Sequence, residues 1–380
     1  MSEVLFVTWD GGGNVPPALG IATELAARGH SVRFLGHAGQ REAVTAAGFP
    51  FVSGPRTRAF SALDDNSPPA LIAMFGDRGM GQDLLEEVTA RPADVVVVDC
   101  LLVGVLDAAR RAGLRYVVLE HLYDAYFRRG WLRGPIGLGM RLKRLQPRRA
   151  LAGAELTLVA TLPSLDPAGK QPGPDLTFVG PVVPAPRDRP PSDAPAERPT
   201  VLVSLSTYRF PGMAGNLQRI LDACAGLDVR VVATTGPVID PAELRAPENA
   251  EVHRFVPHAE LMPGASLVIG HGGHGTTMQA LAHDLPLVVM PMHPMLDQPV
   301  VGRSVEQAGA GRVVSKKASA ADLRPVIAGL LADGPHRAAA ARLGAEIRGT
   351  PGATTGADRI EGLLRAAPRA PERGRPATPR

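Results

Sequence analysis

The sequence predicts an α/β protein with two similar domains that face each other across a cleft. Short β-rich segments alternate with helical segments in both halves of the chain, a pattern typical of parallel sheets covered by helices. A proline-rich segment at 181–199 separates the two halves. The length of 380 residues is sufficient for two domains with separate hydrophobic cores.

The first domain is expected to cover residues 1–180. The run DVVVVD at 94–99 has four consecutive valines, as buried strands of parallel sheets often do. A helix expected at 18–28 carries apolar residues at helical spacing and ends before Gly29. Further strands are expected at 4–8, 32–35 and 115–120, and further helices at 41–47 and 101–114.

The second domain is expected at 200–365, after a linker at 181–199 that contains seven prolines. Residues 366–380 have a composition typical of a disordered tail. Ligands of open parallel sheets bind beyond the carboxyl ends of the strands, which favours a site between the domains. Strands are expected at 201–206, 229–235, 251–256, 266–271 and 286–291, and helices at 214–225 and from residue 275.

Composition and charge narrow the protein class. The net charge of +4 is mild, and no nucleic-acid partner is expected. No apolar run reaches the roughly 20 residues that a membrane-spanning helix needs. No signal peptide is visible, so we expect a cytoplasmic protein. Cys100 and Cys224 lie far apart in apolar or helical surroundings and are expected to be free, buried thiols.

The segment TWDGGGNVPP at 8–17 is expected to form the end of a strand, an open loop and the start of a helix. Glycines allow backbone angles that side chains forbid and let other groups approach closely, and proline is favoured in the first helical turn. The segment lacks the glycine spacing of a dinucleotide-binding fingerprint, which disfavours a dehydrogenase. Asp10 and Asn14 are the side chains of this loop that could take part in chemistry.

The segment HGGHGTT at 271–277 follows a predicted strand and opens a predicted helix. Unpaired N–H groups and the positive helix end form an anion site there, to which His271 can add a hydrogen bond. Gly272 and Gly273 allow a ligand to approach, and Thr276 can donate its hydroxyl. The alternative interpretation is a tight turn with histidines at the surface.

Residues 255–298 resemble the donor-binding motif of family-1 nucleotide-sugar-dependent glycosyltransferases, which have the GT-B fold of two Rossmann-like domains. The resemblance rests on three pieces in order: Phe255-Val256-Pro257, then His271 to Thr276, then Pro294 with Asp297 and Gln298. The linker and the closing helix also fall in the family's order. Within this family the chain looks most like actinobacterial enzymes that decorate natural products, such as antibiotics.

The resemblance implies a role for each matching residue. Phe255 would stack on the pyrimidine of the donor, and Val256 would meet the edge of the base through its main chain. The diphosphate would bind the loop and helix start formed by His271, Gly273, Gly275 and Thr276. Asp297 and Gln298 would hold sugar hydroxyls, and Thr207 would contact phosphate. Two alternatives remain open, in which Phe255 packs in the core and Asp297 caps a helix.

One position departs from the family pattern on the donor side. Members that use uridine donors often carry a glutamate where this chain has Gln279. An amide can hydrogen-bond the ribose, but without the assistance of a charge. The difference favours a TDP-sugar over a UDP-sugar, because deoxyribose has one hydroxyl fewer.

The catalytic base is the second departure. The family keeps a histidine or an aspartate where this chain has Asn14, whose amide cannot accept a proton at neutral pH. We rank Asp10 first as the substitute, then Asp99, where family enzymes keep an acid that partners the base, and then His121. In the alternative interpretation, Asp10 only stabilises its loop.

The resemblance implies an inverting glycosyltransferase that needs no cofactor other than its TDP-sugar or UDP-sugar co-substrate. No closely spaced ligand set indicates a metal. The acceptor is expected to be hydrophobic and to bind near 55–81 and 121–149, two irregular segments that contain several aromatic and methionine residues. A homodimer is also conceivable.

Residues 128–149 contain eight basic side chains and no acidic one. This run favours an anionic acceptor or a membrane surface, or it forms an ordinary solvated face. Two further functions therefore stay open: transfer to a lipid acceptor at a membrane, and a non-catalytic helper of another glycosyltransferase, which Asn14 makes conceivable.

Overall fold

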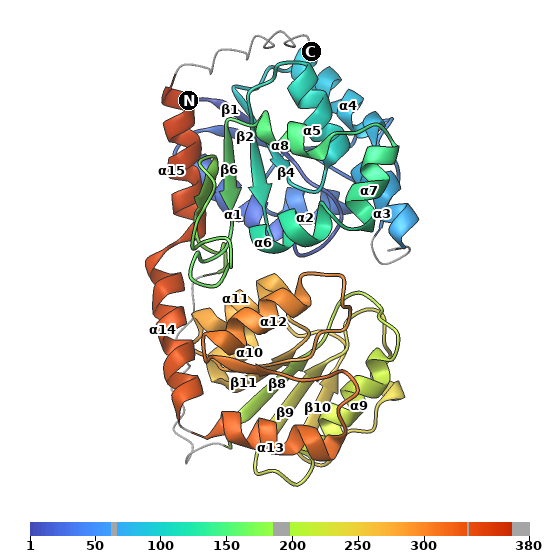
Figure 1. Cartoon of the computed structure of the whole chain (residues 1–380), viewed down its shortest axis with the longest axis vertical. Helices are drawn as coiled ribbons and strands as arrows, with labels where there is room; N and C mark the ends of the chain where they lie inside the picture. Colours follow the sequence, from blue (N-terminus) through green and yellow to red (C-terminus); the bar gives the residue numbers. More distant parts are fainter. Residues whose placement is uncertain (62–66, 185–197, 333, 367–380) are drawn as a thin grey trace, which may run out of the picture.

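A computed structural model of the chain describes residues 1–61, 67–184, 198–332 and 334–366. It contains two parallel sheets in two domains (Figure 1). The seven-stranded N-terminal sheet has the order β3-β2-β1-β4-β5-β6-β7, and every neighbouring pair is parallel. Its strands are β1 (Glu3–Val7), β2 (Ser31–Leu35), β3 (Phe51–Val52), β4 (Val95–Asp99), β5 (Tyr116–Glu120), β6 (Leu156–Val159) and β7 (Leu176–Phe178).

The C-terminal sheet has six parallel strands in the order β10-β9-β8-β11-β12-β13. In both sheets the first strand of the domain lies inside the sheet and the chain winds outward to either side. The strands of the C-terminal sheet are β8 (Thr200–Ser204), β9 (Arg230–Thr234), β10 (Ala250–His253), β11 (Ala265–Gly270), β12 (Leu287–Val289) and β13 (Gly311–Val313).

Helices cover both faces of each sheet. In the N-terminal domain these are α1 (Val15–Ala27), α2 (Arg41–Ala46), α3 (Pro68–Phe75), α4 (Arg78–Ala90), α5 (Val103–Arg111), α6 (Asp124–Tyr126), a π-helical turn at Phe127–Trp131, α7 (Pro135–Leu142) and α8 (Pro147–Ala152). In the C-terminal half they are α9 (Met213–Cys224), α10 (His258–Leu261), α11 (His274–Ala282), α12 (Gln298–Gln307), α13 (Ala320–Leu331), α14 (Pro335–Gly349) and α15 (Gly352–Arg365).

Alternate residues of each buried strand contribute to different cores, as the period of a strand requires. Val4 and Phe6 of β1 pack with α1, whereas Leu5 and Val7 pack with the helices on the opposite face. The four valines of β4 are all buried. Burial on both sides explains why the central strands are apolar throughout, and the predicted fold class is confirmed.

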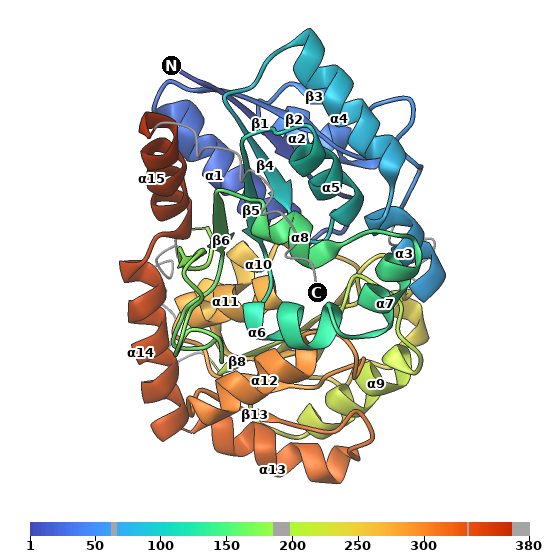
Figure 2. The ribbon, with the colours of Figure 1, turned by 45° about the horizontal axis from the view of Figure 1, so that its top comes forward.

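Helix α15, the last in the described part of the chain, crosses back to the N-terminal domain. Figures 1 and 2 show α14 and α15 along one side of the molecule, with α15 beside α1. Ala357 and Ile360 of α15 belong to the same core as Ile21 of α1. The sequence-based boundaries assign α15 to the second domain, 200–365. In the structure, this helix instead covers the sheet of the N-terminal domain.

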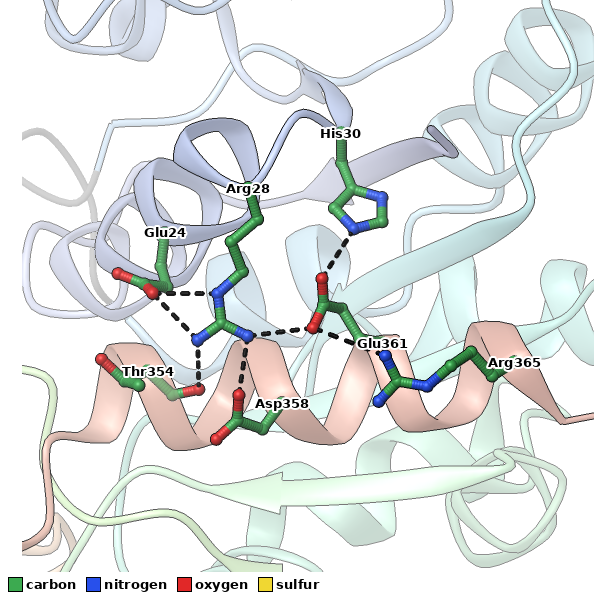
Figure 3. A network of polar contacts seen from close by, with 7 residues as sticks. All are labelled: Glu24, Arg28, His30, Thr354, Asp358, Glu361 and Arg365. Carbon is green, nitrogen blue, oxygen red and sulfur yellow. Dashed lines mark hydrogen bonds and ion pairs between the residues drawn. The ribbon is translucent and has the colours of Figure 1, made fainter.

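Charged residues reinforce this contact between α1 and α15 (Figure 3). The guanidinium of Arg28 contacts Glu24, Asp358 and Glu361, and the His30 ring contacts the other carboxylate oxygen of Glu361 at 3.0 Å. Arg28 is only 22% exposed, so this network is better shielded from solvent than an isolated surface pair.

The predictions for the linker and the tail fall largely outside the described residues, which exclude 185–197 and 367–380. The strand predicted at 251–256 ends earlier, at His253. Among the residues that the structure describes, no helix combines the length and the apolar character required to cross a membrane.

Candidate active site

The loops at the carboxyl ends of both sheets meet between the domains. Tyr208, just beyond β8, donates a hydrogen bond to the carbonyl of Gly11, just beyond β1. Tyr126, in α6 after β5, donates to the carbonyl of Met295 after β12 at 2.9 Å. Figure 2 shows α6 beside α11 and α12. The loops that carry both predicted halves of the site therefore meet where the two domains are in contact.

The glycine-rich loop after β11 has the geometry expected of an anion site. Gly272 has φ of +85°, and a Cβ there would lie 2.9 Å from the carbonyl oxygen of Gln298, so glycine is required. Helix α11 begins at His274, and its first N–H groups have no partner within the helix. Gly275 is exposed and Thr276 is half-buried at this helix start.

His271 adds a neutral imidazole to this loop. Burial lowers the pKa of His271 to about 4, so the ring is uncharged at neutral pH. A neutral ring can donate one hydrogen bond to a phosphate oxygen, while the positive charge comes from the helix end. A Cβ on Gly273 would lie 2.7 Å from this ring, so the glycine leaves the space that the imidazole occupies.

The residues predicted to bind the nucleoside, and Thr207, predicted to contact phosphate, are exposed or half-buried. The Phe255 side chain is 77% exposed, which excludes the interpretation that it packs in the core. Val256 follows it and is half-buried, and Thr207 is exposed beyond the end of β8. Gln279 is half-buried in the second turn of α11.

Asp297 and Gln298 lie at the start of α12 and differ in availability. Burial raises the pKa of Asp297 to about 6, although the charge of His121 across the cleft acts in the opposite direction. The Oε1 atom of Gln298 accepts hydrogen bonds from the backbone N–H groups of Met292 and His293 at 2.8 and 3.0 Å. That oxygen already stabilises its own loop, so the amide N–H group of Gln298 is the part left for a sugar hydroxyl.

Asp99 and His121 come together on the opposite side of the cleft. Nδ1 of His121 lies 2.9 Å from one carboxylate oxygen of Asp99. The other oxygen of Asp99 accepts hydrogen bonds from the indole of Trp9 at 3.1 Å and from the backbone of Leu101 at 3.0 Å. Burial would lower the pKa of His121, but the carboxylate of Asp99, with a smaller contribution from Asp297, raises it above its usual value.

The loop after β1 places Asn14 and Asp10 in different surroundings. Asn14 is 1% exposed and donates to the carbonyl of Trp9 at 2.9 Å. The backbone N–H of Asp10 donates to Nδ1 of His37, whose pKa burial lowers to about 4. The carboxylate of Asp10 lies beside Gly39, in the loop that follows β2.

The Cys100 thiol completes a cluster whose ligand-type atoms all lie within 4.8 Å of those of Asp99 and His121. Sequence spacing did not predict this cluster, because its members follow two different strands. Burial, with the nearby charges of Asp99 and Glu120, raises the pKa of the thiol well above its usual range. A protonated thiol is a poor ligand, so we assign an acid–histidine ion pair here.

Aromatic side chains close the floor of the acceptor side. The Trp9 ring contacts Phe60 and Phe75, and Phe75 in turn contacts Trp131 edge-on at 5.7 Å. Met74, Phe75, Met80, Tyr123, Tyr126, Phe127 and Trp131 are buried and Phe60 is half-buried. The aromatic residues expected near the acceptor therefore pack mainly against one another, with Trp9 among them.

Two parallel-sheet domains in contact through loops at the carboxyl ends of their strands are the arrangement of transferases with the GT-B fold. Residues 218–363 match the family model described as the C-terminal domain of erythromycin biosynthesis protein CIII-like proteins. The chain is 30% identical to 4'-demethylrebeccamycin synthase of Lentzea aerocolonigenes, with 96% of this chain and 100% of that protein covered.

Two solved structures show the same fold. The calicheamicin glycosyltransferase CalG4 has a TM-score of 0.79 at 24% identity, over 97% of this chain and 100% of that one. The spinosyn rhamnosyltransferase SpnG complexed with thymidine diphosphate has a TM-score of 0.72 at 20% identity, over 95% and 100%. The chain belongs to the GT-B family of nucleotide-sugar-dependent glycosyltransferases, of the type found in actinobacterial natural-product pathways. It is a glycosyltransferase, as the motif predicted.

Proposed function

We propose that the protein transfers a sugar or deoxysugar from a TDP-sugar or UDP-sugar to a hydrophobic natural-product acceptor, with inversion and without a metal ion. One observation carries this proposal. His274, in the first turn of α11, and Asp297, at the start of α12, are both close enough to His121 of the Asp99–His121 pair for their charges to interact. The donor and the acceptor would thus meet between a leaving-group site and a proton acceptor.

The donor side would stabilise the departing diphosphate through fixed dipoles. The N–H groups at the start of α11 and the imidazole of His271 would bind phosphate oxygens, whose charge increases as the sugar bond breaks. Asp297 would accept hydrogen bonds from sugar hydroxyls, and Gln298 would donate one. Attack from the acceptor side, opposite the diphosphate, would invert the anomeric carbon.

Two observations favour a thymidine donor. Gln279 lacks the charge with which a glutamate would hold a second ribose hydroxyl. The solved structure of SpnG, which shares this fold, carries thymidine diphosphate. The similarity to 4'-demethylrebeccamycin synthase supports a natural-product acceptor.

The test is a screen of the purified protein for binding of TDP and UDP and for hydrolysis of TDP-sugars and UDP-sugars. We expect TDP to bind and at least one TDP-sugar to be hydrolysed slowly in the absence of an acceptor. Matched variants are His271→Ala, which should weaken TDP binding, and His283→Gln, at the far end of the same helix, which should not. Failure of every nucleotide to bind would refute the donor assignment.

A membrane-associated acceptor is the second candidate, and helix α7 favours it. Leu138 and Leu142 lie one helical turn apart and are 50% and 77% exposed, within the basic run 128–149. Exposed leucines among basic residues are typical of helices that contact anionic lipid surfaces. Cosedimentation with phosphatidylglycerol vesicles should then exceed that with phosphatidylcholine vesicles and fall in a Leu138→Ser, Leu142→Ser variant. Equal, weak sedimentation with both would exclude this candidate.

Other features of the proposal have simpler tests. We propose a cytoplasmic location, which fractionation of the producing cells would examine. Sedimentation velocity would test for a homodimer. The helper function would be favoured only by a protein that never turns over yet raises the activity of a partner glycosyltransferase.

A further inference from the structure

The loop after β1 leaves the usual base position without a base. Asn14 is buried beneath this loop, and its amide nitrogen donates to the carbonyl of Trp9 at 2.9 Å. The side-chain oxygen of Asn14 has no hydrogen-bond partner among the described residues, but an amide oxygen does not take up a proton at neutral pH. The group from the loop after β1 that contacts Asp99 is the indole N–H of Trp9, and an indole N–H can only donate a hydrogen bond.

Asp10, our first candidate from the sequence, lies toward the other edge of the sheet. Its backbone contacts His37 and its carboxylate lies beside Gly39, both in the loop after β2. In the sheet, β2 flanks β1 on one side, whereas β4 and β5 lie on the other. Asp99 and His121 follow β4 and β5, so Asp10 and the pair lie on opposite sides of β1.

His121 has the position and partners that a base needs. It begins the loop after β5, and its side chain is 12% exposed. A carboxylate oxygen of Asp99 lies 2.9 Å from Nδ1, and its negative charge favours the tautomer with the proton on Nδ1. Nε2 is then the nitrogen with a free lone pair. Asp297, the predicted sugar-binding carboxylate, is close enough to His121 for each to shift the pKa of the other.

We infer that His121, oriented by Asp99, is the general base of this enzyme, in place of the residue that the family carries at position 14. This inference rests on the proposed function. Nε2 removes the proton of the acceptor hydroxyl while its oxygen bonds to the anomeric carbon. The bond from that carbon to the diphosphate oxygen breaks, and the diphosphate keeps the electron pair. Asp99 stabilises the imidazolium, which later loses its proton to water.

The titratable groups near His121 are Asp99, Asp297, His274 and the Cys100 thiol, whose raised pKa keeps it uncharged. Asp99, beyond β4, and Asp297, at the start of α12, both favour the imidazolium, whereas burial opposes it. His274, in the first turn of α11, is itself neutral because burial lowers its pKa to about 3. Together these groups raise the pKa of His121 above its usual value of about 6.5. The activity should therefore begin to fall at a pH higher than 6.5 as the solution is made more acidic.

The experiment compares His121→Ala, His121→Gln and Asp99→Asn with Asp10→Asn and with the control His283→Gln. Both His121 variants should lower kcat roughly 10²- to 10⁴-fold and leave TDP affinity unchanged, because the residue lies outside the diphosphate site. Added imidazole should restore part of the rate of His121→Ala. Asp99→Asn should shift the acid limb of the kcat profile to lower pH, because it removes the charge that stabilises the imidazolium.

The results separate this inference from the proposed function. If the wild type turns over and His121→Ala keeps the full rate, the base assignment is wrong while the glycosyltransferase remains. If only Asp10→Asn loses kcat, the general base is Asp10, in the loop after β1. If His121→Ala does not fold, the milder His121→Gln variant and the pH profile of Asp99→Asn still test the assignment. An acid limb of the kcat profile that does not shift in Asp99→Asn would show that Asp99 does not act on His121.

Discussion

The two sides of the cleft differ in how closely they follow the family pattern. On the donor side, the loop after β11 and the start of α12 carry the motif in order, and the structure shows a helix start, a neutral imidazole and a buried carboxylate. On the acceptor side, the loop after β1 lacks the usual base, and a histidine from another strand lies beside the retained acid. The donor side is encoded in one stretch of sequence, whereas the acceptor side is assembled from the ends of several strands, so a missing group there can be supplied from elsewhere in the sheet.

The largest effect on the donor side should come from Asp297→Asn. Losing a charged hydrogen bond to the sugar should raise the donor KM roughly 10- to 100-fold at pH 8. Because burial raises the pKa of Asp297 to about 6, the carboxylate is charged above that pH and neutral below it. Donor affinity of the wild type should therefore fall as the pH decreases through about 6, and the variant should lack this step. A wild-type affinity that does not depend on pH would contradict the role of Asp297.

Gly273→Ala tests whether the imidazole belongs to the diphosphate site. The new Cβ would lie 2.7 Å from the His271 ring and displace it. Loss of one hydrogen bond should weaken TDP binding by roughly tenfold. Gly329→Ala in α13 is the matched control, because a Cβ there meets no atom within 4 Å. Unchanged TDP affinity in Gly273→Ala would remove His271 from the site.

Phe255→Ala should cost about tenfold in nucleotide affinity, since stacking of a base on an aromatic ring is worth roughly 1–3 kcal/mol. Phe255 is largely exposed, so the thermal midpoint of the free protein should hardly change. Calorimetry of TDP binding together with a melting curve measures both quantities. A large drop in the melting temperature with unchanged affinity would show a structural role instead.

The smallest effect should come from Gln279→Glu. A charged acceptor at this position should improve the binding of UDP relative to TDP by a few-fold, because charge-assisted hydrogen bonds are stronger than neutral ones. Competition between the two nucleotides gives the ratio directly. An unchanged ratio would mean that position 279 does not distinguish ribose from deoxyribose in this enzyme.

The sequence was sufficient for the fold and for the enzyme class, but less so for the acceptor side. The valine run of β4 and the glycine loop after β11 are local patterns, and local patterns determine strands and helix starts. The Asp99–His121 pair depends on β4 and β5 being neighbours, and the Trp9–Asp99 hydrogen bond depends on β1 lying beside β4. Long-range contacts of this kind leave no spacing signal in a single sequence. The sequence therefore favours Asp10, next to the glycines, as the catalytic base over His121, which lies more than 100 residues away.

The return of α15 to the N-terminal domain has a practical consequence. A fragment cut at the proline-rich segment would lack the helix that covers Ile21 and pairs with Arg28, and its exposed apolar face would favour aggregation. When the donor-binding domains of related enzymes are exchanged, residues 352–365 should therefore come from the same enzyme as the N-terminal domain. The natural module for such chimeras is discontinuous, because residues 352–365 belong with the N-terminal domain.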